Sequence, residues 1–110
     1  MRTLVDGSQP RQAAPSLEDL RSRRTEILEV CANNGASNVW VFGSVARGEN
    51  DDESDVDLLA DIEARRSLFD LAALIGELED ALGCPVNIVE RQLLKYDRFA
   101  ANVLRDMVPL

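Results

Sequence analysis

The sequence predicts an α/β (α+β) protein with a small mixed β-sheet backed by helices. Three short segments that contain apolar residues, the first of them rich in β-branched and aromatic residues, alternate with longer segments whose apolar residues recur at helical spacing. The chain has 110 residues, 45% hydrophobic and 29% charged, which fits one globular domain with a single core. Alternation of strands with helices then predicts one sheet with helices packed against it.

The N-terminal part predicts a tail followed by a helix. Residues 1–15 are polar, contain two prolines and show no periodicity, so we expect a flexible N-terminal tail. Ser16 is a suitable N-cap, and acidic residues follow it in the first turn. One helix is then expected up to Asn33–Gly35, with apolar residues Leu17, Leu20, Ile27, Leu28 and Cys31. The folded domain is expected to span residues 16–110.

The middle of the chain predicts two strands that enclose a short helix and a loop. Residues 38–42 and 56–60 are short, apolar and β-prone. Residues 44–47 predict a short helix after Gly43, and the acidic residues 48–54 predict a solvated loop. Trp40 is expected to anchor the first strand in the core, with stacking on an adenine as the alternative.

The last third predicts a helix, a strand and a final helix. Ser67 and Asp70 form a capping-box-like pair, and Gly83 follows the last apolar residue of that helix. Its apolar positions are Phe69, Leu71, Ala72, Leu74, Ile75, Leu78 and Leu82. Residues 85–90 predict a third strand. Residues 91–108 predict one helix with Leu94, Phe99, Val103 and Met107 toward the core, and with Tyr96 half-buried or in contact with a partner.

Composition limits the classes of function. The formal net charge is -8 and the pI about 4.4, so the phosphate backbone of a nucleic acid would be repelled. The absence of histidine removes the commonest general base and zinc ligand. Cys31 and Cys84 form no C-x-x-C pair, which favours a reduced, intracellular protein. Without a signal peptide or membrane-spanning segment, a cytoplasmic location with no membrane partner is expected.

A Gly-Ser pair between the first strand and the short helix predicts a phosphate site. Gly43 lets the backbone approach a ligand closely, and the first free N–H groups of the helix would point at an anion. The Ser44 hydroxyl can donate another hydrogen bond, and Arg47 lies one turn later. A turn with an ordinary N-cap is the alternative for this pair alone.

Two aspartates at the start of the second strand predict a magnesium site. Asp55 and Asp57 are two residues apart, so on a strand they lie on one face with Cα atoms roughly 7 Å apart. Such carboxylates repel one another unless a cation neutralises them. Magnesium accepts carboxylates together with phosphate oxygens, which the Gly-Ser turn would bring close. Exposed acids at a strand start are the alternative for the Asp-x-Asp pattern alone.

These motifs together resemble a known family. The segment "GSVARGENDDESDVDLL", residues 43–59, resembles the signature of the DNA polymerase β-type nucleotidyltransferase superfamily. The small size and the segments "ALGCPVNIVE" and "VLRDMVPL" are similar to minimal nucleotidyltransferases, which are typically antitoxins paired with HEPN-domain toxins. The resemblance covers about residues 16–110 and implies the polymerase β-type core for this chain.

The resemblance implies a role for each matching residue. Gly43 and Ser44 would hold the triphosphate, Asp55 and Asp57 would bind Mg²⁺, and Arg47 would support the phosphates or the loop. The implied reaction is transfer of AMP from ATP to a hydroxyl, usually a tyrosine of the partner HEPN toxin, which neutralises the toxin. A hetero-oligomer of antitoxin and toxin is therefore expected.

One residue departs from the family pattern. The family usually carries a third carboxylate on the third strand, and the matching position here is Asn87. Asn87 could hold magnesium through its amide oxygen but cannot accept a proton near neutral pH. Glu90 has the opposite strand parity and is a poor substitute. Two alternatives therefore stay open: a non-catalytic antitoxin that inhibits by binding, and a nucleotidyltransferase that acts on RNA or a small molecule.

Overall fold

A computed structural model describes residues 14–110 and contains a four-stranded mixed sheet in the order β3-β2-β1-β4. The strands are β1 (Ala36–Phe42), β2 (Val56–Ile62), β3 (Val86–Glu90) and β4 (Val108–Pro109). β1 pairs antiparallel with both β2 and β4, whereas β2 pairs parallel with β3. The predicted mixed sheet backed by helices is confirmed.

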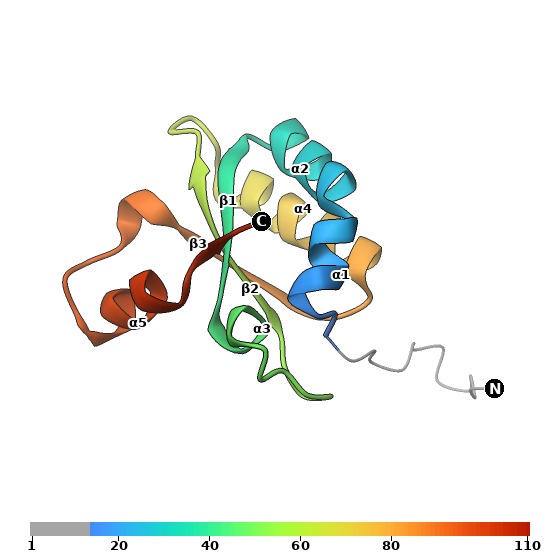
Figure 1. Cartoon of the computed structure of the whole chain (residues 1–110). Coiled ribbons are helices and arrows are strands. Elements are labelled where there is room, and N and C mark those ends of the chain that lie inside the picture. The colour runs from blue at the N-terminus through green and yellow to red at the C-terminus, as the bar shows by residue number, and fades with distance from the viewer. Residues whose placement is uncertain (1–13) are drawn as a thin grey trace.

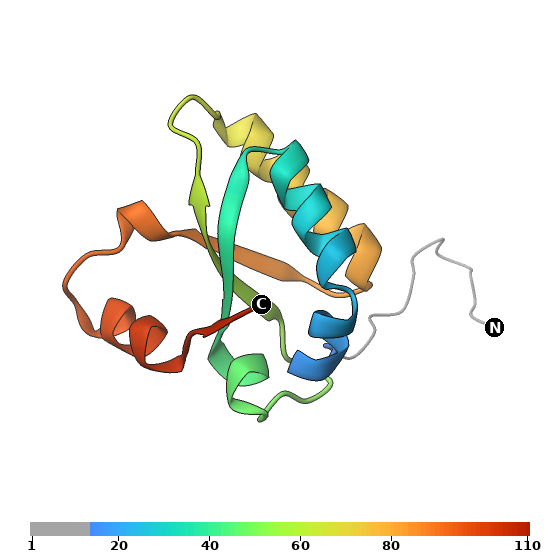
Figure 2. The ribbon, with the colours of Figure 1, turned by 45° about the horizontal axis from the view of Figure 1, so that its top comes forward.

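One face of the sheet is covered by helices α1 (Leu17–Ser22), α2 (Arg24–Asn33) and α4 (Leu68–Leu82), as Figures 1 and 2 show. The main core lies between these helices and the sheet. It contains alternate residues of the strands, among them Val41, Leu58 and Val86, together with Leu20, Ile27, Leu74 and Leu78 of the helices. The apolar residues that alternate along the strands and those that recur at helical spacing therefore pack into the same core.

The second face of the sheet carries helix α5 (Arg98–Asp106), which lies on the opposite side from α2 and α4 (Figure 1). A smaller apolar cluster joins Phe42, Leu59 and Val103 there, with Trp40 and Met107 packed at its edge. Because Asp57 is two residues from Leu59 on β2, the side chain of Asp57 lies on this second face. The fold thus separates an apolar core face from a face that carries polar residues.

Several predicted helix boundaries are confirmed by their caps. The Ser16 hydroxyl accepts from the Asp19 amide, and the Ser67 hydroxyl accepts from the Asp70 amide, each within a complete capping box. Gly83 ends α4 at a φ of 74°, in the left-handed region that glycine adopts without strain. A short helix α3 (Gly43–Arg47) follows β1 as predicted.

The single helix predicted before β1 is interrupted. Arg23 has φ -108° and ψ 18° and separates α1 from α2. The Ser22 hydroxyl donates to the Asp19 carbonyl at 2.7 Å, which competes with the helical backbone bond. The turned Arg23 guanidinium donates to the Ala81 carbonyl of α4 at 2.7 Å, so the interruption ties two helices together.

The single helix predicted for residues 91–108 is wrong. The chain forms a 3₁₀ turn η1 (Arg91–Leu93), an extended connection, α5 and then β4. Asp97 starts α5 because its side chain accepts from the Ala100 amide at 2.9 Å. The added strand β4 pairs with the free edge of β1, where Pro109 is tolerated because an edge strand needs fewer donors.

Three large residues predicted as apolar helix positions are exposed, and so is Tyr96, which was predicted to be half-buried or in contact with a partner. The exposed fractions are 37% for Leu28, 87% for Phe69, 53% for Phe99 and 109% for Tyr96. Tyr96 lies before α5 and not within a helix, so its predicted half-buried position is wrong. The ring of Phe99 still packs edge-on against Phe42 at 6.2 Å between centroids.

The flexible tail predicted for residues 1–15 falls outside the described residues except for Ala14 and Pro15. Ala14 is buried, and its carbonyl accepts from the Asn50 side chain at 3.2 Å. None of the helices in residues 14–110 combines the length and the apolar character that crossing a membrane requires.

Candidate active site

The predicted carboxylates and amide meet at one end of the second face. Asp55 immediately precedes β2, Asp57 lies within it, and Asn87 lies directly beside Asp57 in the parallel register with β3. The Asn87 amide nitrogen donates to Oδ1 of Asp57 at 3.0 Å and to Oδ2 of Asp55 at 3.4 Å. Because the β2–β3 pairing fixes this register, residues 30 positions apart in sequence share one polar site.

Gly43 brings the turn after β1 against the same carboxylates. Phe42 pairs with Asp57 across the β1–β2 ladder, and Gly43 follows it at a φ of 74°. A Cβ at Gly43 would overlap Oδ2 of Asp57 and would lie 3.3 Å from its Cγ. Glycine is therefore required here both by the positive φ and by the close approach to the carboxylate.

Ser44 occupies the first turn of α3 and is half-buried. Its hydroxyl makes no hydrogen bond to another residue within 14–110, while its carbonyl accepts from the Glu49 amide at 2.8 Å. α3 has only five residues, so its dipole is small. The first free N–H groups and the Ser44 hydroxyl are the local donors that could meet an anion beside Asp57.

Arg47 forms ion pairs with two acids outside the pair of aspartates. Its Nε donates to Glu49 at 2.9 Å and its Nη1 donates to Asp106 of α5 at 2.6 Å. The Asp106 side chain is only 7% exposed, whereas that of Arg47 is 41% exposed. Arg47 thus links α3 to α5, and its charge still acts on the Asp57 carboxylate from a distance.

Burial perturbs the carboxylate of Asp57. Burial raises the pKa of Asp57 above its ordinary value, and the negative charge of Asp55 raises it further. The hydrogen bond from Asn87 and the charge of Arg47 work in the opposite direction without cancelling the rise. A cation placed between the aspartates would relieve this repulsion.

The side chains at this site fit a magnesium ion if the amide oxygen of Asn87 acts as a ligand together with the two aspartates. Within residues 14–110 no group of three or more His, Cys, Asp or Glu side chains could hold a metal. Asp55 and Asp57 supply carboxylate oxygens, and Asn87 supplies an amide oxygen if its amide turns from donor to ligand. Magnesium accepts such oxygens and completes its coordination with water and phosphate.

Sequence reasoning missed the acid that holds Arg47. Asp106 lies 59 residues from Arg47 and in a helix whose start was placed wrongly, so no local pattern pointed to it. It also missed Asp61, which accepts from Arg91 at 2.6 Å. Strand parity could have found Asp61, because it lies four residues from Asp57 and therefore on the same face of β2.

The mixed sheet places the Gly-Ser turn against the paired aspartates, the two motifs on which the resemblance to nucleotidyltransferases rests. The model of the family described as "Nucleotidyltransferase domain" matches residues 24–109. The chain therefore belongs to the nucleotidyltransferase domain family, and the resemblance found in the sequence is confirmed at this level.

Two relatives extend over most of the chain. The protein adenylyltransferase MntA of Thermococcus cleftensis is 42% identical over 94 residues, which is 84% of this chain and 94% of the relative. A solved structure assigned as a minimal nucleotidyltransferase is 48% identical, with a TM-score of 0.74 over 87% of this chain and 97% of that one. The first is named for transfer of an adenylyl group to protein.

A more distant structure shares the fold alone. A crystal structure of a toxin–antitoxin with AMP-PNP has a TM-score of 0.66 and 18% identity, over 77% of this chain and 69% of that chain. Its agreement supports the architecture of sheet and helices described above.

Proposed function

We propose that the protein is an antitoxin that transfers AMP from ATP to a hydroxyl of a partner protein, a tyrosine of a HEPN-type toxin, and so neutralises it. The observation that carries this proposal is the contact between Gly43 and Asp57, with Asn87 on the other side of that carboxylate. This close approach would bring a phosphate held by the Gly-Ser turn next to a metal ion held by the two aspartates. The similarity to a protein adenylyltransferase supports a protein as the acceptor.

The residues would divide the work as follows. The backbone of Gly43 and Ser44 would hold the triphosphate, while Asp55, Asp57 and the Asn87 amide oxygen would hold Mg²⁺. Bound Mg²⁺ would neutralise the phosphate charge that grows as pyrophosphate leaves. Arg47 would steady the turn through its pair with Asp106 and add positive charge near the phosphates. The site would thus act by positioning and charge neutralisation.

The bonds that change are simple to state. The acceptor hydroxyl oxygen would form a bond to the α-phosphorus of ATP, and the bond from that phosphorus to the bridging oxygen of pyrophosphate would break. The hydroxyl proton needs a base, and Asn87 cannot serve as one near neutral pH. The proton would therefore pass to water, and the rate would be lower than with a carboxylate at this position.

The contact made by Asn87 supports a second candidate function. Its amide already binds both aspartates at 3.0 and 3.4 Å, which partly satisfies their charge without a metal. A protein that inhibits its toxin by binding alone would keep such a neutralised site. In either case we propose a cytoplasmic hetero-oligomer of this chain with the toxin.

The experiment is an intact-mass measurement of the partner toxin, co-purified with this chain, before and after incubation with ATP and Mg²⁺. Enzymatic transfer adds one or more AMP units to the toxin, and Asp57→Asn removes the gain while the complex persists. A toxin that stays neutralised without any gain in mass would select the binding-only antitoxin. A gain that is unchanged in Asp57→Asn would overturn the assignment of Asp57.

A further inference from the structure

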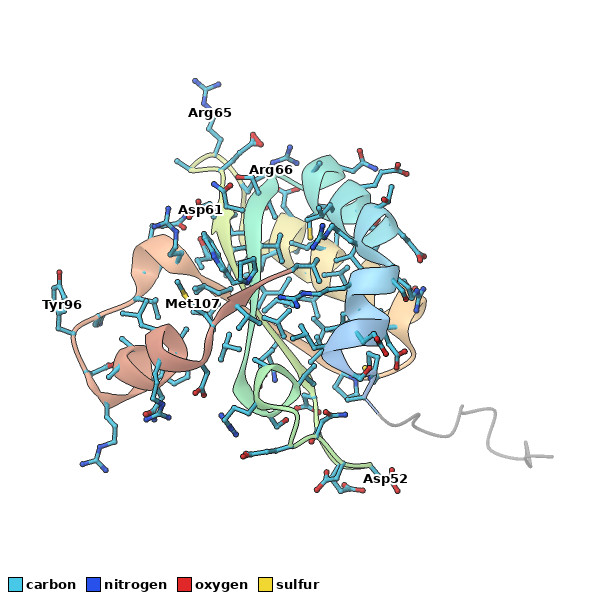
Figure 3. All side chains as sticks on the ribbon, viewed as in Figure 1. Asp52, Asp61, Arg65, Arg66, Tyr96 and Met107 are labelled. Carbon is cyan, nitrogen blue, oxygen red and sulfur yellow. The ribbon has the colours of Figure 1, made fainter. Side chains whose placement is uncertain are left out.

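A groove lies on the second face of the sheet, away from the main core. It has a volume of about 570 Å³ and lies between β1, the connection before α5 and α5 itself. Half-buried Trp40, Leu94 and Met107 contribute to its wall, and Ala100 and Ala101 present small side chains from α5. Figure 3 shows Met107 turned toward the sheet and Tyr96 projecting away from the body of the domain.

One wall of the groove is fixed by a charged contact. The Arg91 guanidinium donates to the two carboxylate oxygens of Asp61 at 2.6 and 3.0 Å. The Asn38 side chain donates to the same carboxylate at 2.9 Å. Arg91 in turn lies 5.4 Å from the centre of the Trp40 ring, in cation–π contact. The Arg91 side chain that lines the groove is therefore positioned by residues of β1 and β2.

Exposed large apolar side chains gather in the segment that borders the groove. Seven large hydrophobic side chains are exposed in residues 14–110, and four of them fall between residues 93 and 104: Leu93, Tyr96, Phe99 and Leu104. Tyr96 and Leu104 line the groove directly. Exposed apolar side chains gathered beside a groove are typical of a protein interaction site.

The same segment is basic in an acidic protein. Residues 91–105 contain four basic side chains and one acidic side chain, a net charge of +3, whereas the whole chain carries -8. Lys95 and Arg98 form no ion pair with any residue in 14–110. Arg91 and Arg105 are paired with acids outside this segment, so its unpaired positive charge is that of Lys95 and Arg98. Lys95 lines the groove, so a partner that seats apolar side chains there would meet this charge.

The groove shares a sheet face and a helix with the candidate active site. Trp40 and Phe42 of β1 and Asp57 of β2 point to the second face. α5 lines the groove with Ala100 and Leu104 and holds Arg47 with Asp106. A protein seated in the groove would lie beside the carboxylates and would be oriented by the same helix.

We propose that this groove docks a helix of the protein that accepts the AMP, with apolar side chains on one face of that helix and carboxylates beside them. The proposal rests on the function proposed above and adds the chemistry of the recognised surface. A second copy of this chain could bring its acidic loop to the rim. Residues 49–54 of that loop contain no apolar side chain, so the loop cannot fill the groove.

A pair of designed peptides tests this chemistry without any nucleotide. Both form amphipathic helices with leucine on one face and lack tryptophan and tyrosine. One carries glutamate on the other face, and the second carries lysine at the same positions. Trp40 is the only tryptophan of the chain, so its fluorescence reports binding in the groove. We expect the glutamate peptide to bind and the lysine peptide to bind at least about tenfold more weakly.

Matched variants locate the binding surface. Tyr96→Ala with Leu104→Ala should weaken the glutamate peptide about tenfold or more, since exposed anchors of this kind dominate interfaces. Phe69→Ala with Leu68→Ala removes an equally exposed pair at the start of α4 and should change nothing. Lys95→Glu should reduce the preference for the glutamate peptide. Arg65→Glu, in the loop between β2 and α4 (Figure 3), should leave it intact.

The outcomes separate this proposal from transfer itself. Equal binding of both peptides, or equal effects of the two alanine pairs, would overturn the proposal. A dimer in light scattering that Tyr96→Ala with Leu104→Ala abolishes would make the occupant a second copy and would also overturn it. Tyr96→Ala with Leu104→Ala should abolish binding of the toxin. Asp57→Asn should still bind the toxin and should lose only the transfer of AMP. If Tyr96→Ala with Leu104→Ala abolishes toxin binding but the unsubstituted protein transfers no AMP, docking in the groove is supported and the proposed enzymatic activity is rejected.

Discussion

The Asp106 carboxylate of α5 accepts a hydrogen bond of 2.6 Å from the Arg47 guanidinium of α3. This ion pair joins the helix beside the Gly-Ser turn to the helix that lines the groove. Asp106 also accepts from Arg105 at 3.3 Å. It is the direct physical link between the two surfaces proposed above.

Replacing this acid should lower stability in a pH-dependent way. Burial acts to raise the pKa of Asp106, but the hydrogen bonds from Arg47 and Arg105 outweigh it, and the pKa is lowered. Its stabilising effect is therefore complete above the pKa of about 3.9 in the unfolded chain and is lost as the pH falls through the lower folded value. Thermal unfolding of Asp106→Asn should show a lower Tm than wild type at pH 7, and the two curves should converge in acid. A constant difference at every pH would contradict this account.

Adding one methyl group at Gly43 should damage the site more than the fold. Gly43→Ala meets both a positive φ and the Asp57 carboxylate. Gly48→Ala is the matched control, because Gly48 has φ 73° and nothing within 4 Å of an added Cβ. Both changes should cost about 1 kcal/mol of folding free energy from the backbone alone. Calorimetric titration with ATP and Mg²⁺ should show loss of binding only in Gly43→Ala, and equal affinities would remove the argument for the close approach.

Restoring a carboxylate on β3 should make the protein more dependent on metal. Asn87→Asp would place a third negative charge beside Asp57, whose pKa is already raised by burial and by Asp55. Without metal, the Tm should fall. With Mg²⁺, the increase in Tm should exceed that of the wild-type protein because a ligand that binds only the folded state stabilises it. Transfer activity should be preserved or raised, and a marked loss would show that the site depends on the amide.

Releasing Arg91 should be visible in the fluorescence of Trp40. The hydrogen bonds from Arg91, followed by the one from Asn38, lower the pKa of Asp61, so this carboxylate stays charged at neutral pH. Asp61→Asn would remove the charge that holds Arg91 over the Trp40 ring. The emission of the single tryptophan should change with little loss of Tm, because the Arg91–Asp61 pair is partly exposed, with 50% and 24% of the two side chains accessible. Asp80→Asn on α4 is a suitable control with unchanged emission.

Local rules predicted those parts of the fold whose causes are local. The capping boxes at Ser16 and Ser67 and the glycine that ends α4 depend on neighbouring residues, and all were placed from the sequence. Parity on a strand was enough to put Asp55 and Asp57 together. The resemblance to the family then aligned Asn87 with them, and the β2–β3 register places it beside Asp57.

The features that were missed depend on contacts between distant segments. β4 exists because the edge of β1 accepts it, and two residues carry too little pattern to predict a strand. Residues 91–108 have apolar spacing for one helix, yet Asp97 caps a new one and the chain must cross the sheet. The turn of Arg47 toward Asp106 likewise depends on where α5 packs.

The order of the strands also fixes when the second face becomes covered. β3 and β4 are the two edges of the sheet, and residues 91–107 run from one edge to the other. β1, β2, β3 and the helices of the first face all precede this segment in the chain, so they can pack together before α5 docks. Phe42 and Leu59 then remain bare until α5 arrives, and an incomplete chain exposes a sheet surface prone to aggregation. Docking of α5 thus protects the folding chain from association as well as shaping the finished surface.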